Sequence, residues 1–260
     1  MTARRLGRAY LLLLLLFILG PALVVAIDSF NSATSFPSPF ESFTLRWYGA
    51  IGDHPEFWDA FLVSLVVAVA AAAIGTLCGF LGAYALVRLP PARRNAVATL
   101  LTSPLLVPEI VVGLAALQLA SLSHIPLGIP LLVAVHSVFV LPLATRVILA
   151  GFSRYDLGLE EAARSLGASP RRVVLLVTLP VLRPTLAAAF VLATILSFVN
   201  LPLSMFLTSA QTATLPVILF AYMESRIDPT IAAVATLVMV AAAATAFAVD
   251  RVLKVRLIES

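Results

Sequence analysis

Long apolar runs alternate with short polar segments along most of the chain. A helix needs about 20 apolar residues to cross the hydrocarbon core of a bilayer, and six runs come close to that length. These predicted spans lie at residues 9–27, 60–87, 96–120, 129–150, 179–200 and 230–250. Runs such as LLLLLLFILG are apolar at every position rather than at alternate ones, which favours helices over the strands of a β-barrel. The pattern therefore predicts an all-α integral membrane protein with six transmembrane helices.

The composition supports this class. Hydrophobic residues make up 61% and charged residues 12% of the chain, whereas soluble domains average roughly 45–50% and about 25%. The polar segments are too short for a separate soluble domain, so residues 1–260 are expected to form a single transmembrane domain. Gly75 and Gly79 have the small-x-x-x-small spacing of closely packed membrane helices. Cys78, the only cysteine, lies in an apolar run, which excludes a disulfide scaffold and a Cys-rich metal site.

The basic residues concentrate in alternate loops. Thirteen of them lie before the first span, in 88–95, in 151–178 and after the last span, whereas the other loops hold only Arg46 and Arg226. Cytoplasmic loops are the ones enriched in Lys and Arg, so both ends are predicted to be cytoplasmic. This scattered charge gives no basic face for nucleic acid, and membrane lipid is the expected surrounding. The outward segment 28–59 is expected to form an ordered polar cap.

The first span begins with basic residues, as a signal peptide does. Its apolar run is longer than the roughly 7–15 residues of a typical signal-peptide core. We therefore expect the first span to be retained.

The loop between the fourth and fifth spans carries several helix signals. Asp156 can start a helix, and Glu160 and Glu161 lie in its first turns, where the helix dipole favours negative charge. Gly167 can end this helix in the left-handed conformation, and Ser169-Pro170 can start another. An apolar stripe at helical spacing is formed by Leu159, Ala162, Ala163 and Leu166.

The stripe alone leaves two interpretations open. The helix can lie on the membrane interface, or it can dock against another protein. Small alanines suit close docking, and the opposite face is not rich in Lys, as an interfacial helix is. Further along, Pro180 and Pro184 are expected to bend or break the entry into the fifth span.

This loop resembles the EAA motif of ABC-importer permease subunits. The matching residues are Glu161-Ala162-Ala163, Gly167, and Val177-x-Leu179-Pro180, with Val177 standing where the family usually has Ile. The resemblance implies the type I importer (MetI-like) fold, with 153–170 as the coupling segment to a separate ATPase. Glu161 would pair with a basic residue of the ATPase, and Gly167 would make the turn. The residues implied in ATPase coupling are Glu161, Ala162, Ala163, Leu166, Gly167 and Pro180.

The resemblance also implies an assembly in the bacterial inner membrane. Its members would be two ATPase subunits, a second permease subunit, and a periplasmic or lipid-anchored solute-binding protein. The second permease is expected to be a related but different chain, with a homodimer as the alternative. ATP and Mg would bind to the ATPase, since this chain has no GxxxxGK[ST] loop, and no cofactor is expected on the chain itself.

Three further segments, 44–48, 104–113 and 212–237, resemble spermidine/putrescine-type permeases. They imply that the solute is a polyamine or a similar small amine. Related subgroups of the family that carry 2-aminoethylphosphonate, γ-aminobutyrate, thiamine or ferric iron are the alternatives.

Polar side chains at membrane depth are candidates for the solute pathway, because unpaired polar groups are costly in lipid. Glu109 follows Pro108, where an interrupted backbone can line a cavity, and its carboxylate would favour a cationic solute. Gln118, His136 and Asn200 either line the same pathway or form hydrogen bonds between helices.

Two other classes of protein fit the sequence less well. No catalytic or metal-binding residues are expected, because the histidines lie on different elements and neither HExxH nor GxSxG occurs. A half-size secondary transporter or channel is the second alternative, and in it Glu109 would relay protons. Such a protein needs no ATPase-docking helix, so the EAA-like loop argues against it.

Overall fold

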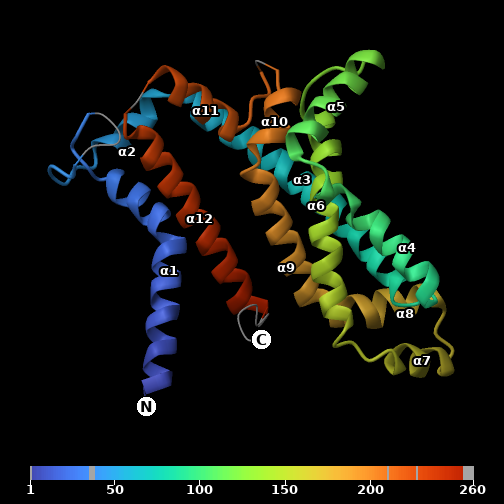
Figure 1. The fold of residues 1–260 in the computed structure, drawn as a ribbon. Helices are drawn as coiled ribbons and strands as arrows, with labels where there is room; N and C mark the ends of the chain where they lie inside the picture. Colours follow the sequence, from blue (N-terminus) through green and yellow to red (C-terminus); the bar gives the residue numbers. More distant parts are fainter. Residues whose placement is uncertain (1, 35–38, 210, 227, 254–260) are drawn as a thin grey trace. The chain divides into compact units, whose positions relative to one another are not determined.

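The structure is a computed structural model that describes residues 2–34, 39–209, 211–226 and 228–253. Over these ranges the chain is helical almost throughout (Figure 1). Five helices of the described residues are long and apolar enough to cross a membrane, which confirms five of the six predicted spans. They are α1 (Thr2–Asp28), α3 (Pro55–Leu86), α6 (Ile129–Phe152), the continuous helix of α8 (Pro170–Val173), η3 (Val174–Thr178) and α9 (Leu179–Phe198), and α12 (Thr230–Leu253).

The predicted span 96–120 is not one continuous helix. This region consists of α4 (Pro91–Thr102), the 3-10 turn η2 (Ser103–Leu106) and α5 (Glu109–Leu122). Between η2 and α5, Val107 is extended, with φ −95° and ψ 128°. Proline removes a backbone donor and disfavours helical geometry in the residue before it, so Pro104 and Pro108 explain the break. The apolar pattern continues across both prolines, which is why it indicated a single span, with an interruption expected only beside Pro108.

At the entry to the fifth span, where a bend or a break was expected, the helix is not broken. The chain stays helical from Pro170 to Phe198, and Pro180 stands in the first turn of α9 while Pro184 lies inside it. The residues just before α9 form the π-helical turn η3, in which the backbone bonds span five residues. This wider turn accommodates the missing N–H of Pro180 without ending the helix.

The chain divides into two compact units, residues 1–59 with 218–243 and residues 60–217 with 244–260. In the first unit, the predicted polar cap is folded where it is described, although 35–38 lie outside the described residues. The indole nitrogen of Trp47, in α2 (Arg46–Ala50), donates to the carbonyl oxygen of Asn31 at 2.7 Å, and η1 (Ile51–Asp53) follows α2 directly. The ring of Tyr222, on α11 (Leu215–Ser225), packs against His54 and Phe57.

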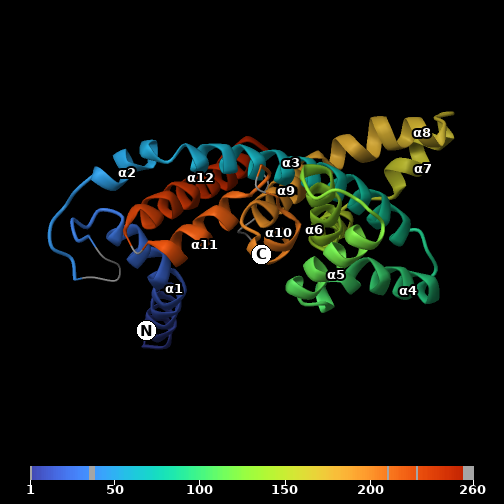
Figure 2. The same cartoon turned by 90° about the horizontal axis from the view of Figure 1, so that it is seen from above.

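The second unit is built around α6, which packs along α9, while α5 packs beside α10 (Leu201–Leu207) (Figure 2). The predicted close packing at Gly75 and Gly79 is confirmed. A Cβ atom on Gly75 would stand 2.5 Å from Cγ2 of Val140, and one on Gly79 would stand 3.0 Å from the backbone nitrogen of Thr145. Within this unit, α5 lies at one end and α7 (Gly158–Ser165) at the other (Figure 1).

Candidate functional site

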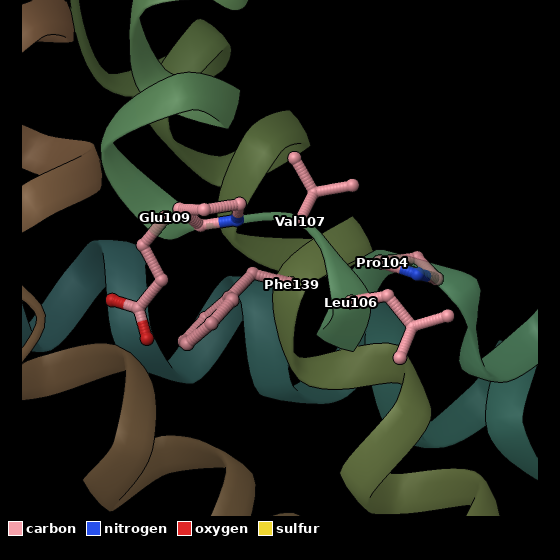
Figure 3. A pocket seen from close by; sticks show the side chains of 6 residues that line it. Pro104, Leu106, Val107, Glu109 and Phe139 are labelled. Atoms are coloured by element: carbon pink, nitrogen blue, oxygen red, sulfur yellow. The ribbon is translucent and has the colours of Figure 1, made fainter.

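The break before α5 opens a cavity of ≈ 340 Å³. Of the six described residues that line it, Glu109 alone is ionisable. Figure 3 shows the carboxylate of Glu109 next to the ring of Phe139, which comes from α6. The full lining is Pro104, Leu106, Val107, Pro108, Glu109 and Phe139. A single carboxylate in an otherwise apolar cavity suits a ligand that combines a positive charge with apolar groups.

Glu109 is held by Asn200, another residue predicted for the pathway. Nδ2 of Asn200 donates to Oε2 of Glu109 at 2.7 Å. The other amide atom, Oδ1 of Asn200, accepts from the backbone nitrogen of Leu203 at 2.9 Å and so caps α10. Asn200 therefore fixes the carboxylate of Glu109 to the first turn of α10.

His136 lies in the interior, between α6, α9 and α10, and is 1% exposed. Its Nδ1 bonds with Oγ of Ser197 at 2.8 Å and its Nε2 with Oγ of Ser204 at 3.2 Å. Ser204 has one hydroxyl proton, which it donates to the carbonyl oxygen of Asn200 at 2.8 Å. Nε2 of His136 must then be the donor to Ser204, and Nδ1 the acceptor from Ser197. His136 thus joins three helices behind Asn200 rather than lining the cavity.

The last predicted pathway residue, Gln118, is exposed on α5 and stands outside this hydrogen-bond chain. The structure therefore brings Glu109, Asn200 and His136 into one connected network and places Gln118 apart from it.

At the other end of the second unit, the predicted turns of the coupling segment are present. Oδ1 of Asp156 accepts from the backbone nitrogen of Gly158 at 2.8 Å, where α7 begins. Gly167 has φ +86°, and the backbone nitrogen of Ala168 reaches back to the carbonyl oxygen of Ala163. This bond, with the left-handed glycine, forms a Schellman end to α7. Ser169 then precedes α8, with Pro170 in its first turn.

Most of the EAA-like residues face outward. Glu161 and Ala162 are exposed, Ala163 is half-buried, and Leu166 is 90% exposed. Two more leucines of this segment, Leu157 and Leu159, are 42% and 45% exposed. Pro180 is exposed at the start of α9. These leucines lie outside the spanning helices, and exposed apolar side chains of this kind mark a contact surface for another protein or for the membrane interface.

Sequence reasoning missed the role of Glu160. Its side chain is 3% exposed, and its Oε1 accepts hydrogen bonds from Oγ1 of Thr178 at 2.7 Å and from the hydroxyl of Tyr155 at 3.2 Å. Nη2 of Arg88 forms an ion pair with the same oxygen. The available signal was Arg164, four residues further along α7, which lies 3.6 Å from Oε2.

The pKa of Glu160 reflects two opposed effects. Burial of the carboxylate raises its pKa, whereas the hydrogen bonds from Arg88 and Thr178 lower it. The bonds outweigh the burial, so the pKa lies below its usual value of 4.5. Glu160 is therefore ionised at neutral pH, and its buried carboxylate is the negative half of an ion pair with the half-buried Arg88.

Comparisons with known proteins show the family of the chain. Residues 71–258 match the family described as "Binding-protein-dependent transport system inner membrane component". The chain is 31% identical to the putrescine transport system permease protein PotI of Escherichia coli (strain K12), over 88% of this chain and 84% of that protein. It is 30% identical to the spermidine/putrescine transport system permease protein PotC of the same strain, over 85% and 83%.

The fold is shared with a solved importer. A chain of a bacterial ABC transporter involved in the import of the acidic polysaccharide alginate matches with a TM-score of 0.71 at 16% identity, covering 99% of this chain and 96% of that one. This likeness confirms the predicted all-α permease fold.

Proposed function

The chain belongs to the family of binding-protein-dependent transport system inner membrane components, and we propose that it carries a polyamine or a similar small amine across the membrane. As an ABC-importer permease, it would form the solute pathway together with a second permease subunit. The observation that carries the choice of solute is the carboxylate of Glu109 at the cavity before α5.

The chemistry of this cavity suits a polyamine. A protonated amine is attracted by the carboxylate of Glu109, and the ring of Phe139 can add a cation–π contact. The apolar lining suits the methylene groups between two amines. Asn200 supports the arrangement because its amide holds the carboxylate in one position. The similarity to the putrescine and spermidine/putrescine permeases favours the same class of solute.

Coupling to ATP hydrolysis forms the second part of the proposal. The exposed face of α7, with Leu166 at its end, would dock on a separate ATPase subunit, and Glu161 would pair with a basic residue there. Two such ATPase subunits would bind ATP and Mg, and this chain would bind no cofactor or metal and carry no catalytic residue. A solute-binding protein would dock on the outward side.

The proposed orientation places α7 and both ends of the chain in the cytoplasm. The concentration of basic residues in the loops on that side supports it. The exposed leucines of α7 then face the compartment that holds ATP.

Uptake of labelled putrescine or spermidine into proteoliposomes tests the solute. The vesicles contain this chain with its ATPase, its second permease and its solute-binding protein. We expect ATP-dependent uptake, and a loss of at least tenfold in uptake for Glu109→Gln, which removes the charge and keeps the shape. Glu224→Gln, an exposed carboxylate on α11, is the matched control.

Three results would contradict the proposal. Unchanged polyamine uptake by Glu109→Gln would remove the carboxylate from the pathway, and competition by thiamine, γ-aminobutyrate, 2-aminoethylphosphonate or ferric iron would identify another solute of the family. Uptake by this chain alone, without an ATPase, would instead support a secondary transporter or channel.

A further inference from the structure

The ends of three long helices meet at one buried carboxylate. Arg88 follows the end of α3, Tyr155 follows α6, and Thr178 closes the π-helical turn that leads into α9. All three bond to Oε1 of Glu160 in α7. The partners come from 72, 5 and 18 positions away in the sequence.

This carboxylate is also the main anchor of α7. Among the eight residues of α7, all of which the structure describes, Glu160 is the only buried one. A surface helix ordinarily buries an apolar stripe. Here leucines beside and within the helix stay exposed, and a charged side chain points inward instead.

The partner guanidinium is itself fixed. Nη1 of Arg88 donates to the carbonyl oxygen of Tyr84 at 2.8 Å, and the guanidinium lies 3.4 Å above the ring of Tyr84. Arg88 therefore has little freedom to follow Glu160 unless the end of α3 moves too. Charge-assisted hydrogen bonds are directional as well as strong. The pair of Arg88 and Glu160 therefore resists sliding and rotation of α7 relative to the end of α3.

We propose that Glu160 is the positioning residue through which a displacement of α7 is passed to the long helices. This inference rests on the proposed function, since it assumes that an ATPase moves α7. The two adjacent glutamates then have separate roles. Glu161 faces outward to the ATPase, and Glu160 faces inward and holds α3, α6 and α9 to the moving helix.

The test measures coupling rather than stability. Purified wild-type and variant complexes with the ATPase, second permease and solute-binding protein are assayed in proteoliposomes for ATP hydrolysed per putrescine taken up. We expect Glu160→Gln to raise this ratio at least tenfold, while the ATPase subunits still co-purify with the chain. Thr178→Val, which removes one bond to the carboxylate, should raise it less. Thr102→Val is the matched control, because its hydroxyl bonds to carbonyls of its own helix.

A second variant separates positioning from folding. Glu160→Gln leaves the half-buried guanidinium of Arg88 without its counter-ion, and this alone can weaken assembly. In the double variant Glu160→Gln with Arg88→Met, no charge is stranded. We expect this variant to assemble normally and still to hydrolyse more ATP per putrescine taken up than the wild type does.

Three outcomes decide the matter. A wild-type ratio of ATP to putrescine in both variants would overturn the positioning role, and so would loss of assembly in the double variant, since Glu160 would then serve folding. Absence of ATP-dependent uptake by the wild-type complex would instead overturn the proposed function, whatever the variants do.

Discussion

Asn200 and Glu109 are 91 positions apart in the sequence, yet Nδ2 of Asn200 donates to Oε2 of Glu109 at 2.7 Å. The bond connects the start of α10 to the start of α5, the two shorter helices that pack together in the second unit. The same side chain caps α10. The amide of Asn200 thus caps α10 and also orients the carboxylate of Glu109, which is proposed to contact the solute.

Replacement of Asn200 by Ala should weaken solute uptake. It removes a hydrogen bond to a charged group, which contributes about 1.5–3 kcal/mol, and a helix cap that contributes about 0.5–2 kcal/mol. We expect the KM for putrescine to rise about tenfold or more, with a lower thermal midpoint. Asn200→Asp separates the two effects, since Asp can cap α10 but repels Glu109. If Asn200→Asp raised KM no more than a surface substitution does, the bond to Glu109 would have no part in uptake.

Close contact between α3 and α6 predicts that Gly79→Ala is destabilising. The added Cβ would lie 3.1 Å from Cβ of Ala144 and 3.0 Å from the backbone nitrogen of Thr145, in the helix opposite. Forced overpacking of this kind costs about 1–3 kcal/mol. Thermal unfolding in detergent should show a lower midpoint for Gly79→Ala. The control is Gly20→Ala on α1, where nothing lies within 4 Å. Ala favours a helix more than Gly does, so Gly20→Ala should not lower the midpoint, and an equal loss there would show that the effect of Gly79→Ala does not come from packing.

The long helices and the local turns were predictable, because each follows from neighbouring residues. The apolar runs located α1, α3, α6 and α12, and the positive φ of Gly167 was expected from its place after the amphipathic stripe. An interrupted backbone was expected only beside Pro108, and the full break at 103–108, which leaves two separate helices, was not predicted although both of its prolines are visible in the sequence. An apolar run shows where a segment is buried in lipid, but it does not show where its backbone bonds are interrupted.

The Glu160 cluster was not predictable for a different reason. Its partners Arg88 and Thr178 reach it only through the packing of distant helices. In the sequence, Glu160 and Glu161 are adjacent and near a helix start, and Arg164 is within helical reach of both, four residues after one and three after the other. Which of the two turns inward depends on the angle at which α7 meets η3, a property of the tertiary structure.

The left-handed turn after α7 predicts which substitutions are tolerated at Gly167. Its φ of +86° is costly for residues with a Cβ, although nothing lies within 4 Å of the place that the Cβ would take. For most L-residues the left-handed conformation costs about 1–2 kcal/mol, and Asn bears it better than Ala. Gly167→Ala should therefore weaken co-purification of the ATPase more than Gly167→Asn does. An equal loss of co-purified ATPase in both variants would mean that the ATPase senses the added side chain on the surface of the turn rather than the backbone conformation of the turn.

The lowered pKa of Glu160 predicts a loss of stability in acid. Since its pKa is lower in the folded chain than in the unfolded chain, the unfolded state takes up the proton first as the pH falls. The stabilising effect of the ion pair with Arg88 is therefore complete well above pH 4.5, and it is lost as the pH drops through 4.5 toward the lower folded value. The thermal midpoint of the purified wild-type protein, measured from pH 7 down to pH 3, should fall more steeply at the acid end than that of Glu160→Gln, which has no proton to gain at this site. Other carboxylates titrate in both proteins, so the difference between the two curves isolates Glu160, and parallel curves would show that its charge does not stabilise the fold.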